Sequence, residues 1–475
     1  LHQRREGAAR LTRSPVRRYQ PTSGSSAAMK WIPYSQAFLD ELDAAICPWV
    51  ADLYRQWPGL RRGRHYWSMS WVPTELRQQI SGDVNDDMKL MSPGKRLVAG
   101  MTQAVPQQVS LTDSSDDSLF ASLAFLVARS DVSLISVWSP TFGLGLLEAL
   151  AGWREELAHV LRTGDWGERT DRMAGLKAPQ SRRGADLLAQ WDGVLRASFF
   201  RELWPGLALV SAWDTAASRP WAHKLHEYLP HADCQGKGLW ATEGVVTIPY
   251  GGNFALAYQS HVYEFRDVQD GRILPPWELR PGQEVTPLLS TGSGLLRYAM
   301  NDRIRVEGFL DSVPALRFLG RDDGTDMVGE KLSVALIQEV LDELDCNHLI
   351  RPVSLVALSD AGNGKPGYWL LAEPVGEGTM DNLRPQLQAT GHALEHRLLH
   401  HFHYKLARDL EQLDPVRCVC HPRMREIYLH QCRARGMIEG NIKVEALQYW
   451  GDDLPEALSG LAALPDDAEA CVEVP

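Results

Sequence analysis

The chain has 475 residues, more than one ordinary hydrophobic core holds, which predicts two or three domains. Hydrophobic residues make up 44% and charged residues 23%, so the composition is globular and excludes wholesale disorder. The net charge of −11 argues against nucleic acid as a partner, because an acidic surface gains nothing from counterion release.

The seven cysteines are odd in number and scattered, which is not a disulfide framework and predicts a reducing cytoplasm. No run of about 18 apolar residues is present, so we expect neither a transmembrane helix nor a membrane partner. The basic stretch Leu1–Gln20 lacks the apolar centre of a signal peptide. Since the first residue is not Met, we expect that an N-terminal piece is missing.

The first part of the chain mixes helical periodicity with short apolar runs. A loop of small residues over Tyr19–Pro33 precedes a helix capped by Ser35. Further on, the pattern predicts strands over Leu207–Trp213, Val245–Ile248 and Val262–Phe265, and a helix over Arg219–Tyr228. This alternation predicts an α/β domain, with β-sheets packed against helices, over residues 1–320.

After Gly320 the composition of the sequence changes. The polar, glycine-containing stretch Arg321–Asp326 suits a hinge. A small, mobile α+β domain over residues 327–475 is expected to follow, with a helix around Leu336–Leu344, a hairpin of Val353–Leu358 with Tyr368–Ala372, and a long helix over Asn382–Leu413.

The segment Thr22–Lys30 is the first whose residues could bind a ligand or take part in catalysis. Its hydroxyls, glycine and lysine suit a polyphosphate, because Gly24 lets the backbone approach while hydroxyls, amides and Lys30 contact phosphate oxygens. The segment is not a Walker A loop. A serine-rich surface turn accounts for it equally well when it is taken alone.

Two further segments could bind the rest of a nucleotide. In Leu239–Gly244 an aromatic residue, a hydroxyl and a carboxylate follow one another, and they could cover a base, touch the α-phosphate and hold Mg²⁺. Asp302, at the start of an expected strand, could accept hydrogen bonds from a ribose diol. Taken alone, Leu239–Gly244 is better explained as an ordinary strand end, and Asp302 is equally well explained as a turn residue.

In their order and spacing, the three segments resemble the phosphate, adenine and ribose motifs of the adenylate-forming superfamily. The finer pattern is similar to the auxin-responsive acyl-acid amido synthetase family. The stretches that carry this likeness are Thr22–Ser26 with Lys30–Tyr34, Ala241–Glu243, Tyr263–Phe265, Gly294–Tyr298 with Asp302–Val306, Tyr404, and Gly440–Lys443.

The resemblance implies a ligase that uses ATP and Mg²⁺ to adenylate a small carboxylic acid and then passes the acyl group to an amine, an amino acid being expected. It places Lys443, Lys30 and Thr242 in catalysis and Glu243 on the metal. The residues implied for nucleotide binding are Ser23, Gly24, Ser25, Ser26, Trp240, Ala241, Thr242, Tyr298 and Asp302.

The chain departs from the family pattern at three places: Ala27 replaces a glycine, Trp240 replaces a tyrosine, and Val444–Ala446 replaces a proline and an arginine. Ala27 and the altered region after Lys443 keep open the alternative of a degenerate, non-catalytic nucleotide-binding protein. A second alternative, which the resemblance disfavours, is an acyl-CoA-type ligase with a thiol acceptor. On position alone, Lys443 is also compatible with a solvated surface lysine.

Other clusters carry weaker signals. Cys418, Cys420 and Cys432 with nearby histidines fit no standard zinc spacing, so core packing is the favoured interpretation. The histidines spaced along residues 392–403 favour a surface stripe over a metal site. The apolar stretch Leu119–Leu150 suits core packing better than the wall of an acyl pocket, although it contains Trp138.

Overall fold

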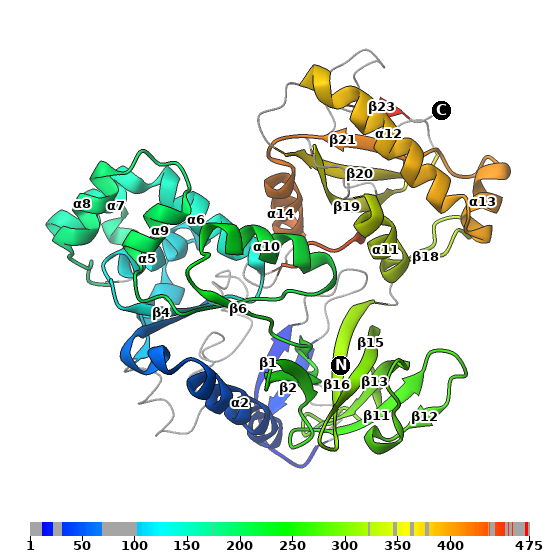
Figure 1. Ribbon diagram of the computed structural model, residues 1–475, viewed down its shortest axis with the longest axis horizontal. Coiled ribbons are helices and arrows are strands. Elements are labelled where there is room, and N and C mark those ends of the chain that lie inside the picture. The colour runs from blue at the N-terminus through cyan, green and yellow to red at the C-terminus, as the bar shows by residue number, and fades with distance from the viewer. Residues whose placement is uncertain are drawn as a thin grey trace.

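The computed structural model describes residues 12–21, 31–68, 102–173, 175–321, 324–344, 349–361, 365–375, 380–435, 437, 442–451, 455, 458 and 471–473. The fold is mixed α/β, as the sequence predicts. Figure 1 shows a large part that begins at the N-terminus and a smaller part, ending at the C-terminus, that packs beside α10 (Arg219–Tyr228) through α14 (Met424–Ala434).

The large part begins with a two-stranded hairpin, β1 (Val16–Pro21) and β2 (Trp31–Ser35), followed directly by helix α2 (Gln36–Gln56). The predicted cap is confirmed: Ser35 Oγ accepts a hydrogen bond from the Phe38 amide at 3.1 Å. An N-cap of this kind satisfies an amide that the first helical turn leaves without an internal partner.

A parallel sheet in the order β3-β4-β5-β6 lies between two helical layers. Alternate side chains face opposite sides of it, so that Leu134 and Leu209 pack against α2 whereas Ile135 and Val210 face the other helices. The strands are β3 (Arg64–Trp67), β4 (Val132–Ser136), β5 (Leu209–Ser211) and β6 (Asp233–Gln235). The covering helices are α5 (Ser115–Val127), α6 (Pro140–Gly152), α7 (Arg154–Thr163), α8 (Arg182–Gln190), α9 (Ala197–Leu203) and α10.

The second sheet is antiparallel, in the order β12-β11-β13-β15-β16-β10-β9 with β14 added on β13. Its strands are β9 (Thr247–Tyr250), β10 (Asn253–Leu256), β11 (Val262–Asp267), β12 (Ile273–Leu274), β13 (Glu284–Ser290), β14 (Tyr298–Ala299), β15 (Asp302–Leu310) and β16 (Val313–Arg321). The strand predicted over Val245–Ile248 is divided at Val246, because the residues before it pair in another hairpin.

The smaller part holds a mixed five-stranded sheet in the order β22-β19-β20-β21-β23. The predicted hairpin is confirmed as β19 (Ile350–Leu358) and β20 (Gly367–Pro374), and the predicted helix as α11 (Val334–Leu344). The remaining strands are β21 (Arg417–Cys420), β22 (Leu447–Gly451) and β23 (Cys471–Glu473). The chain enters this part through Gly324–Thr325 (β17), which pairs with Leu332–Ser333 (β18).

The two faces of this sheet have different neighbours. Alternate side chains, such as Leu355 and Leu370, pack with α11 and the two following helices. The others, such as Val356 and Trp369, belong to the same buried apolar cluster as Trp221 on α10. An ion pair between Arg425 and Glu148 also joins α14 to α6. The two parts therefore share a core.

The prediction of a single long helix over Asn382–Leu413 is wrong. The structure has two helices instead, α12 (Met380–Leu398) and α13 (Phe402–Asp409), separated by a turn. In this arrangement Glu395 accepts hydrogen bonds from Tyr404 Oη at 2.8 Å and from Arg408 Nε at 2.7 Å. On a straight helix, at about 100° per residue, both partners would lie on roughly the opposite side from Glu395. The break lets all three side chains meet.

The cysteines do not form one group. Cys418 packs on the face of the sheet toward α11, whereas Cys432 lies on α14 against the other face. Burial raises the pKa of Cys432 to about 11 and that of Cys420 to about 12, so both thiols keep their protons at neutral pH.

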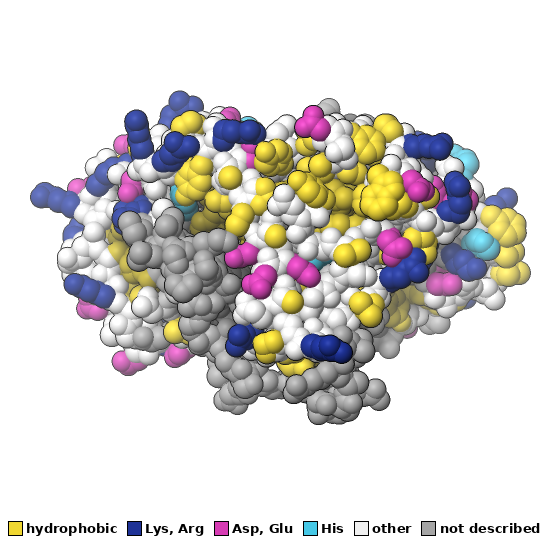
Figure 2. All heavy atoms as spheres, turned by 90° about the horizontal axis from the view of Figure 1, so that it is seen from below, with side chains coloured by type: hydrophobic (Ala, Val, Ile, Leu, Met, Phe, Trp, Pro, Cys, Tyr) yellow, Lys and Arg dark blue, Asp and Glu magenta, His cyan; other side chains and the backbone are white. Residues whose placement is uncertain are grey.

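Two surface properties bear on the expected partners. No helix among the described residues is long and apolar enough to cross a membrane. On the face shown in Figure 2, described lysine and arginine side chains are scattered among acidic ones and do not gather in one stretch.

The Glu395 cluster gives a stability prediction. Glu395 is 5% exposed and also accepts from the Val416 amide at 3.0 Å. Glu395→Gln replaces one of the two acceptors by a donor that faces either the Val416 amide or Arg408 Nε, so we expect the free energy of unfolding in urea to fall by about 1.5–3 kcal/mol. The exposed control Glu411→Gln should change it by less than about 0.5 kcal/mol. Equal effects of the two substitutions would contradict a structural role for the cluster.

Candidate nucleotide and acyl site

Thr242 and Glu243 form the two-residue turn of a short hairpin, β7 (Trp240–Ala241) and β8 (Gly244–Val245). Tyr298 Oη donates to Glu243 Oε1 at 3.0 Å, which joins two of the segments that the sequence singles out. Tyr34 Oη donates to the Thr242 carbonyl at 3.2 Å. The turn is thereby tied to β14 and to β2.

A buried polar chain fixes the same turn from behind. The Val245 amide donates to His261 Nε2 at 3.1 Å, and His261 Nδ1 lies 2.8 Å from Glu41 Oε2. Because an amide can only donate, Nε2 must be without a proton, so Nδ1 carries it and donates to Glu41. Glu41 also accepts from the Gly292 amide at 2.9 Å. Sequence reasoning missed His261 and Glu41, which no local motif marks.

The remaining motif residues lie on the antiparallel sheet beside this turn. Arg297 makes two hydrogen bonds to Glu264, at 2.7 and 3.0 Å, which joins the Gly294–Tyr298 and Tyr263–Phe265 segments. Asp302 is 6% exposed and begins β15, where its Cα pairs with that of Arg321. Asp302 therefore lies next to Gly320, which lines the pocket described below.

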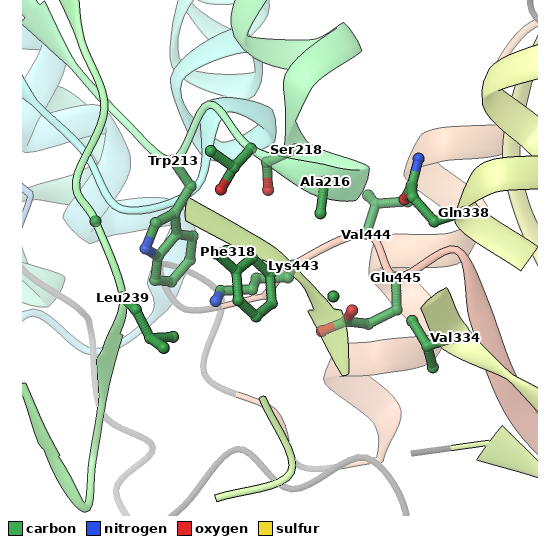
Figure 3. A pocket seen from close by; sticks show the side chains of 13 residues that line it. Trp213, Ala216, Ser218, Leu239, Phe318, Val334, Gln338, Lys443, Val444 and Glu445 are labelled. Atoms are coloured by element: carbon green, nitrogen blue, oxygen red, sulfur yellow. The ribbon is translucent and has the colours of Figure 1, made fainter. Parts of the chain in front are cut away.

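Lys443 extends from the smaller part into a pocket between the two parts of the molecule (Figure 3). Its Nζ lies 3.9 Å from the centre of the Trp213 ring and 5.8 Å from that of Phe318. Gly238 and Leu239, which immediately precede Trp240, line the same pocket. A half-buried lysine held over an aromatic ring in a pocket differs from a solvated surface lysine.

The predicted phosphate segment, with Ser23, Gly24, Ser25, Ser26 and Lys30, lies outside the described residues, as does Ala27. Its flanking residues are described: Pro21 and Trp31 are register partners in the β1–β2 hairpin. Tyr34, on the strand that leaves the segment, makes the hydrogen bond to Thr242 described above.

Five tryptophan side chains form a cluster. The sequence singles out Trp138 and Trp240 individually but does not predict that they belong to one cluster. Neighbouring ring centres lie 5.6–5.9 Å apart. The tryptophan cluster consists of Trp49, Trp67, Trp138, Trp213 and Trp240. Against three of these rings lies Lys237, whose burial lowers its pKa to about 7. No motif in the sequence marks Lys237.

The stretch Leu119–Leu150 serves mainly as core, as expected: Leu123, Leu146 and Leu147 are buried in the large cluster. For metal binding, Glu243 keeps a second carboxylate oxygen beyond the one that Tyr298 contacts. No group of three or more metal-binding side chains gathers within the part of the chain that is described.

Comparison with known families matches residues 4–234 to the GH3 family N-terminal domain and residues 254–321 to the GH3 family central domain. Together these matches cover more than half of the sequence, and the chain belongs to the GH3 family.

Two curated relatives come from Oryza sativa subsp. japonica. The probable indole-3-acetic acid-amido synthetase GH3.12 is 23% identical over 46% of this chain, and the probable indole-3-acetic acid-amido synthetase GH3.2 is 26% identical over 46% of it. The matches cover 42% and 39% of these relatives, so the chain spans about two fifths of the length of the curated relatives it matches.

Solved structures resemble the whole fold. The GH3.15 acyl acid amido synthetase superposes with a TM-score of 0.74 over 97% of this chain and 83% of its own, at 16% identity. The AtGH3.15 acyl acid amido synthetase in complex with 2,4-DB gives a TM-score of 0.75 at the same coverage and identity. At such identity the likeness establishes the α/β fold.

The His261 chain can be tested by stability. His261→Ala leaves the Val245 amide and Glu41 without their buried partner, which should lower the free energy of unfolding by about 1–3 kcal/mol. The exposed histidine of α10 serves as the control, and His223→Ala should cost less than about 0.5 kcal/mol. Urea titration of both variants measures the difference. If both cost the same, the His261 chain does not hold the turn.

Proposed function

We propose that this chain is an ATP-dependent acyl acid amido synthetase that adenylates a small carboxylic acid and transfers the acyl group to an amine, with an amino acid as the expected acceptor. The observation that carries the proposal is the hydrogen bond between Tyr298 and Glu243, which brings two nucleotide motifs together beside the Lys443 pocket. Membership of the GH3 family and the names of its relatives support the same activity.

In the first half-reaction the carboxylate attacks the α-phosphorus of ATP, a P–O bond forms and pyrophosphate leaves. The protein contributes position and positive charge, since phosphoryl transfer needs little covalent help. Ser23, Gly24, Ser25, Ser26 and Lys30 would hold the phosphates and Thr242 would contact the α-phosphate. Glu243 would hold Mg²⁺, which neutralises phosphate charge when bound.

The nucleoside would lie between the two sheets. Asp302 would accept from the ribose hydroxyls, while Trp240, Ala241 and Tyr298 would pack against the base and sugar. In the second half-reaction the amine attacks the acyl carbonyl, a C–N bond forms, AMP leaves and the amine loses a proton. The reactive adenylate must be kept from water, a role that suits the buried aromatic side chains around Trp240.

We also propose that residues 1–320 and 327–475 act as two domains joined at 321–326, and that the smaller one moves between the half-reactions. Adenylation needs Lys443 over the reacting groups, whereas an entering amine needs that space. The end of the central-domain match at Arg321 supports this boundary. In such a motion the ion pair of Arg425 with Glu148 would have to open, and the apolar contacts of Trp221 with the smaller part would have to separate.

Pyrophosphate release tests the function directly. With ATP, Mg²⁺ and indole-3-acetic acid or 2,4-DB, the acid should stimulate release and added amino acids should yield an amide. Glu243→Gln should lower the rate about 100-fold or more, as expected when a metal clamp is weakened. Glu264→Gln, which removes the carboxylate on β11 that accepts hydrogen bonds from Arg297, should cost much less.

Two outcomes would contradict the proposal and favour a different function. Product formed with coenzyme A but with no amino acid would identify a thiol-dependent ligase. Nucleotide binding without acid-dependent pyrophosphate release, across a screen of small carboxylic acids, would identify a non-catalytic binding protein.

Measuring the two half-reactions separately tests whether Lys443 acts in adenylate formation alone. Lys443→Ala should slow adenylate formation at least tenfold while leaving the ATP dissociation constant within about twofold, because its contact would be made mainly in the transition state. Given presynthesised acyl-adenylate, the variant should form amide at a near-normal rate. Equal loss in both half-reactions, or loss in neither, would remove Lys443 from adenylation. Lys405→Ala, an exposed lysine on α13, provides the control.

A further inference from the structure

The carboxyl ends of the parallel strands present one continuous row of residues. Trp67, Ser136, Ser211 and Gln235 end β3, β4, β5 and β6, and each is the register partner of the next. In open α/β sheets this edge is where ligands bind, because the loops that follow the strands leave a crevice there. The tryptophan cluster lies along this edge, since Trp138 and Trp213 follow β4 and β5.

Lys237 is built into this edge by the two glycines beside it. A side chain at Gly236 would collide with the Asp214 carboxylate and the Phe254 ring. Gly238 has a φ of +74°, and a Cβ there would lie 2.6 Å from the Thr247 carbonyl oxygen. Gly238 therefore requires glycine, whereas a side chain at Gly236 would displace Asp214 and Phe254, and the tight Gly236–Gly238 loop directs the lysine inward.

The ammonium group of Lys237 is buried without a counter-charge. The residue is 2% exposed, and its Nζ donates to Ser136 Oγ and lies 5.0–5.7 Å from the centres of the Trp49, Trp67 and Trp138 rings. No carboxylate of the described residues pairs with it. An isolated buried charge is costly, which is why burial lowers the pKa of Lys237, and a bound anion would stabilise the protonated form of this side chain.

Further polar groups on this edge have no partner. Ser211 Oγ is fully buried next to Ser136 in the sheet, and no hydrogen bond to it is found within the described ranges. The same holds for the buried indole nitrogens of Trp213 and Trp240. Buried polar groups are ordinarily satisfied, so these three donors at the same edge of the sheet as Lys237 are available to the oxygen atoms of a bound anion.

We propose that Lys237 binds the carboxylate of the acyl acid at the carboxyl edge of the parallel sheet, with Ser136 and the flanking tryptophan rings. This assignment rests on the proposed function, because it supplies the binding group for the acid of that reaction. Trp138 contacts both Lys237 and Trp213, and Trp213 contacts Lys443. Lys237 would thus hold the carboxylate of the entering acid at one end of an aromatic path, and the carboxylate would leave Lys237 before it attacks the α-phosphorus at the other end, in the pocket that Lys443 enters.

Direct binding tests the assignment without catalysis. Binding of 4-fluorobenzoate to the full chain is followed by ¹⁹F NMR and compared with 4-fluorobenzyl alcohol, which keeps the ring but lacks the charge. We expect the carboxylate to bind at least tenfold more tightly than the alcohol. In Lys237→Met this preference should disappear, while Lys405→Met should keep it.

The lysine-to-methionine change also separates binding from folding. Methionine is unbranched like lysine and one atom shorter, and it removes an isolated buried charge whose desolvation is costly. We therefore expect the melting temperature of Lys237→Met to be unchanged or higher. A fall in melting temperature together with unaltered preference for the carboxylate would make Lys237 a structural residue and overturn the assignment. So would a native protein that shows no preference for the carboxylate.

Pyrophosphate release provides a second readout. With an acid that native protein turns over, Lys237→Met should raise the KM for the acid at least tenfold and leave the KM for ATP within about twofold. Equal changes in both constants would overturn the role. If native protein releases no pyrophosphate with any acid, the proposed function fails, and the NMR comparison alone then decides whether Lys237 binds carboxylates.

Discussion

The hydrogen bond from the Val245 amide to His261 is the contact on which the geometry of the site depends. It fixes the hairpin whose turn carries Thr242 and Glu243, and through Glu41 it ties that turn to α2 and to the Gly292 loop. Helix, hairpin and antiparallel sheet consequently meet at one point. A site assembled from such distant segments needs rigid supports, because small displacements weaken contacts made at hydrogen-bond distance.

Much of the fold could be predicted from local patterns. The Ser35 cap, the helix over Arg219–Tyr228 and the β19–β20 hairpin follow from side-chain periodicity and turn residues, which short stretches of sequence encode. The break after Leu398 could not, because it depends on Glu395 meeting partners 9 and 13 residues further on. Periodicity describes one helix at a time and carries no information about a chain that turns back.

The residues of the site also divide into those that local sequence patterns predict and those that only the folded chain reveals. Thr242, Glu243, Tyr298 and Asp302 are recognisable because they stand in short motifs, and the structure brings Tyr298 to Glu243. His261, Glu41, Trp213 and Lys237 stand in no recognised motif, and their importance comes from neighbours that only the folded chain provides. Lys237 shows why: in the sequence it is one lysine between two glycines, whereas in the fold it is a buried cation among aromatic rings.

The shared core between α10 and α14 also affects how the protein is made. Trp221 belongs to one apolar cluster with Val356, Trp369 and Tyr428, all of which are synthesised later. At a synthesis rate of about 5–20 residues per second, roughly 10–30 s pass between the end of the first part and the end of the chain. During that time the ribosome-bound chain presents an uncovered apolar surface around α10. We therefore expect this surface to bind chaperones during synthesis, and a product that stops short of α14 to aggregate.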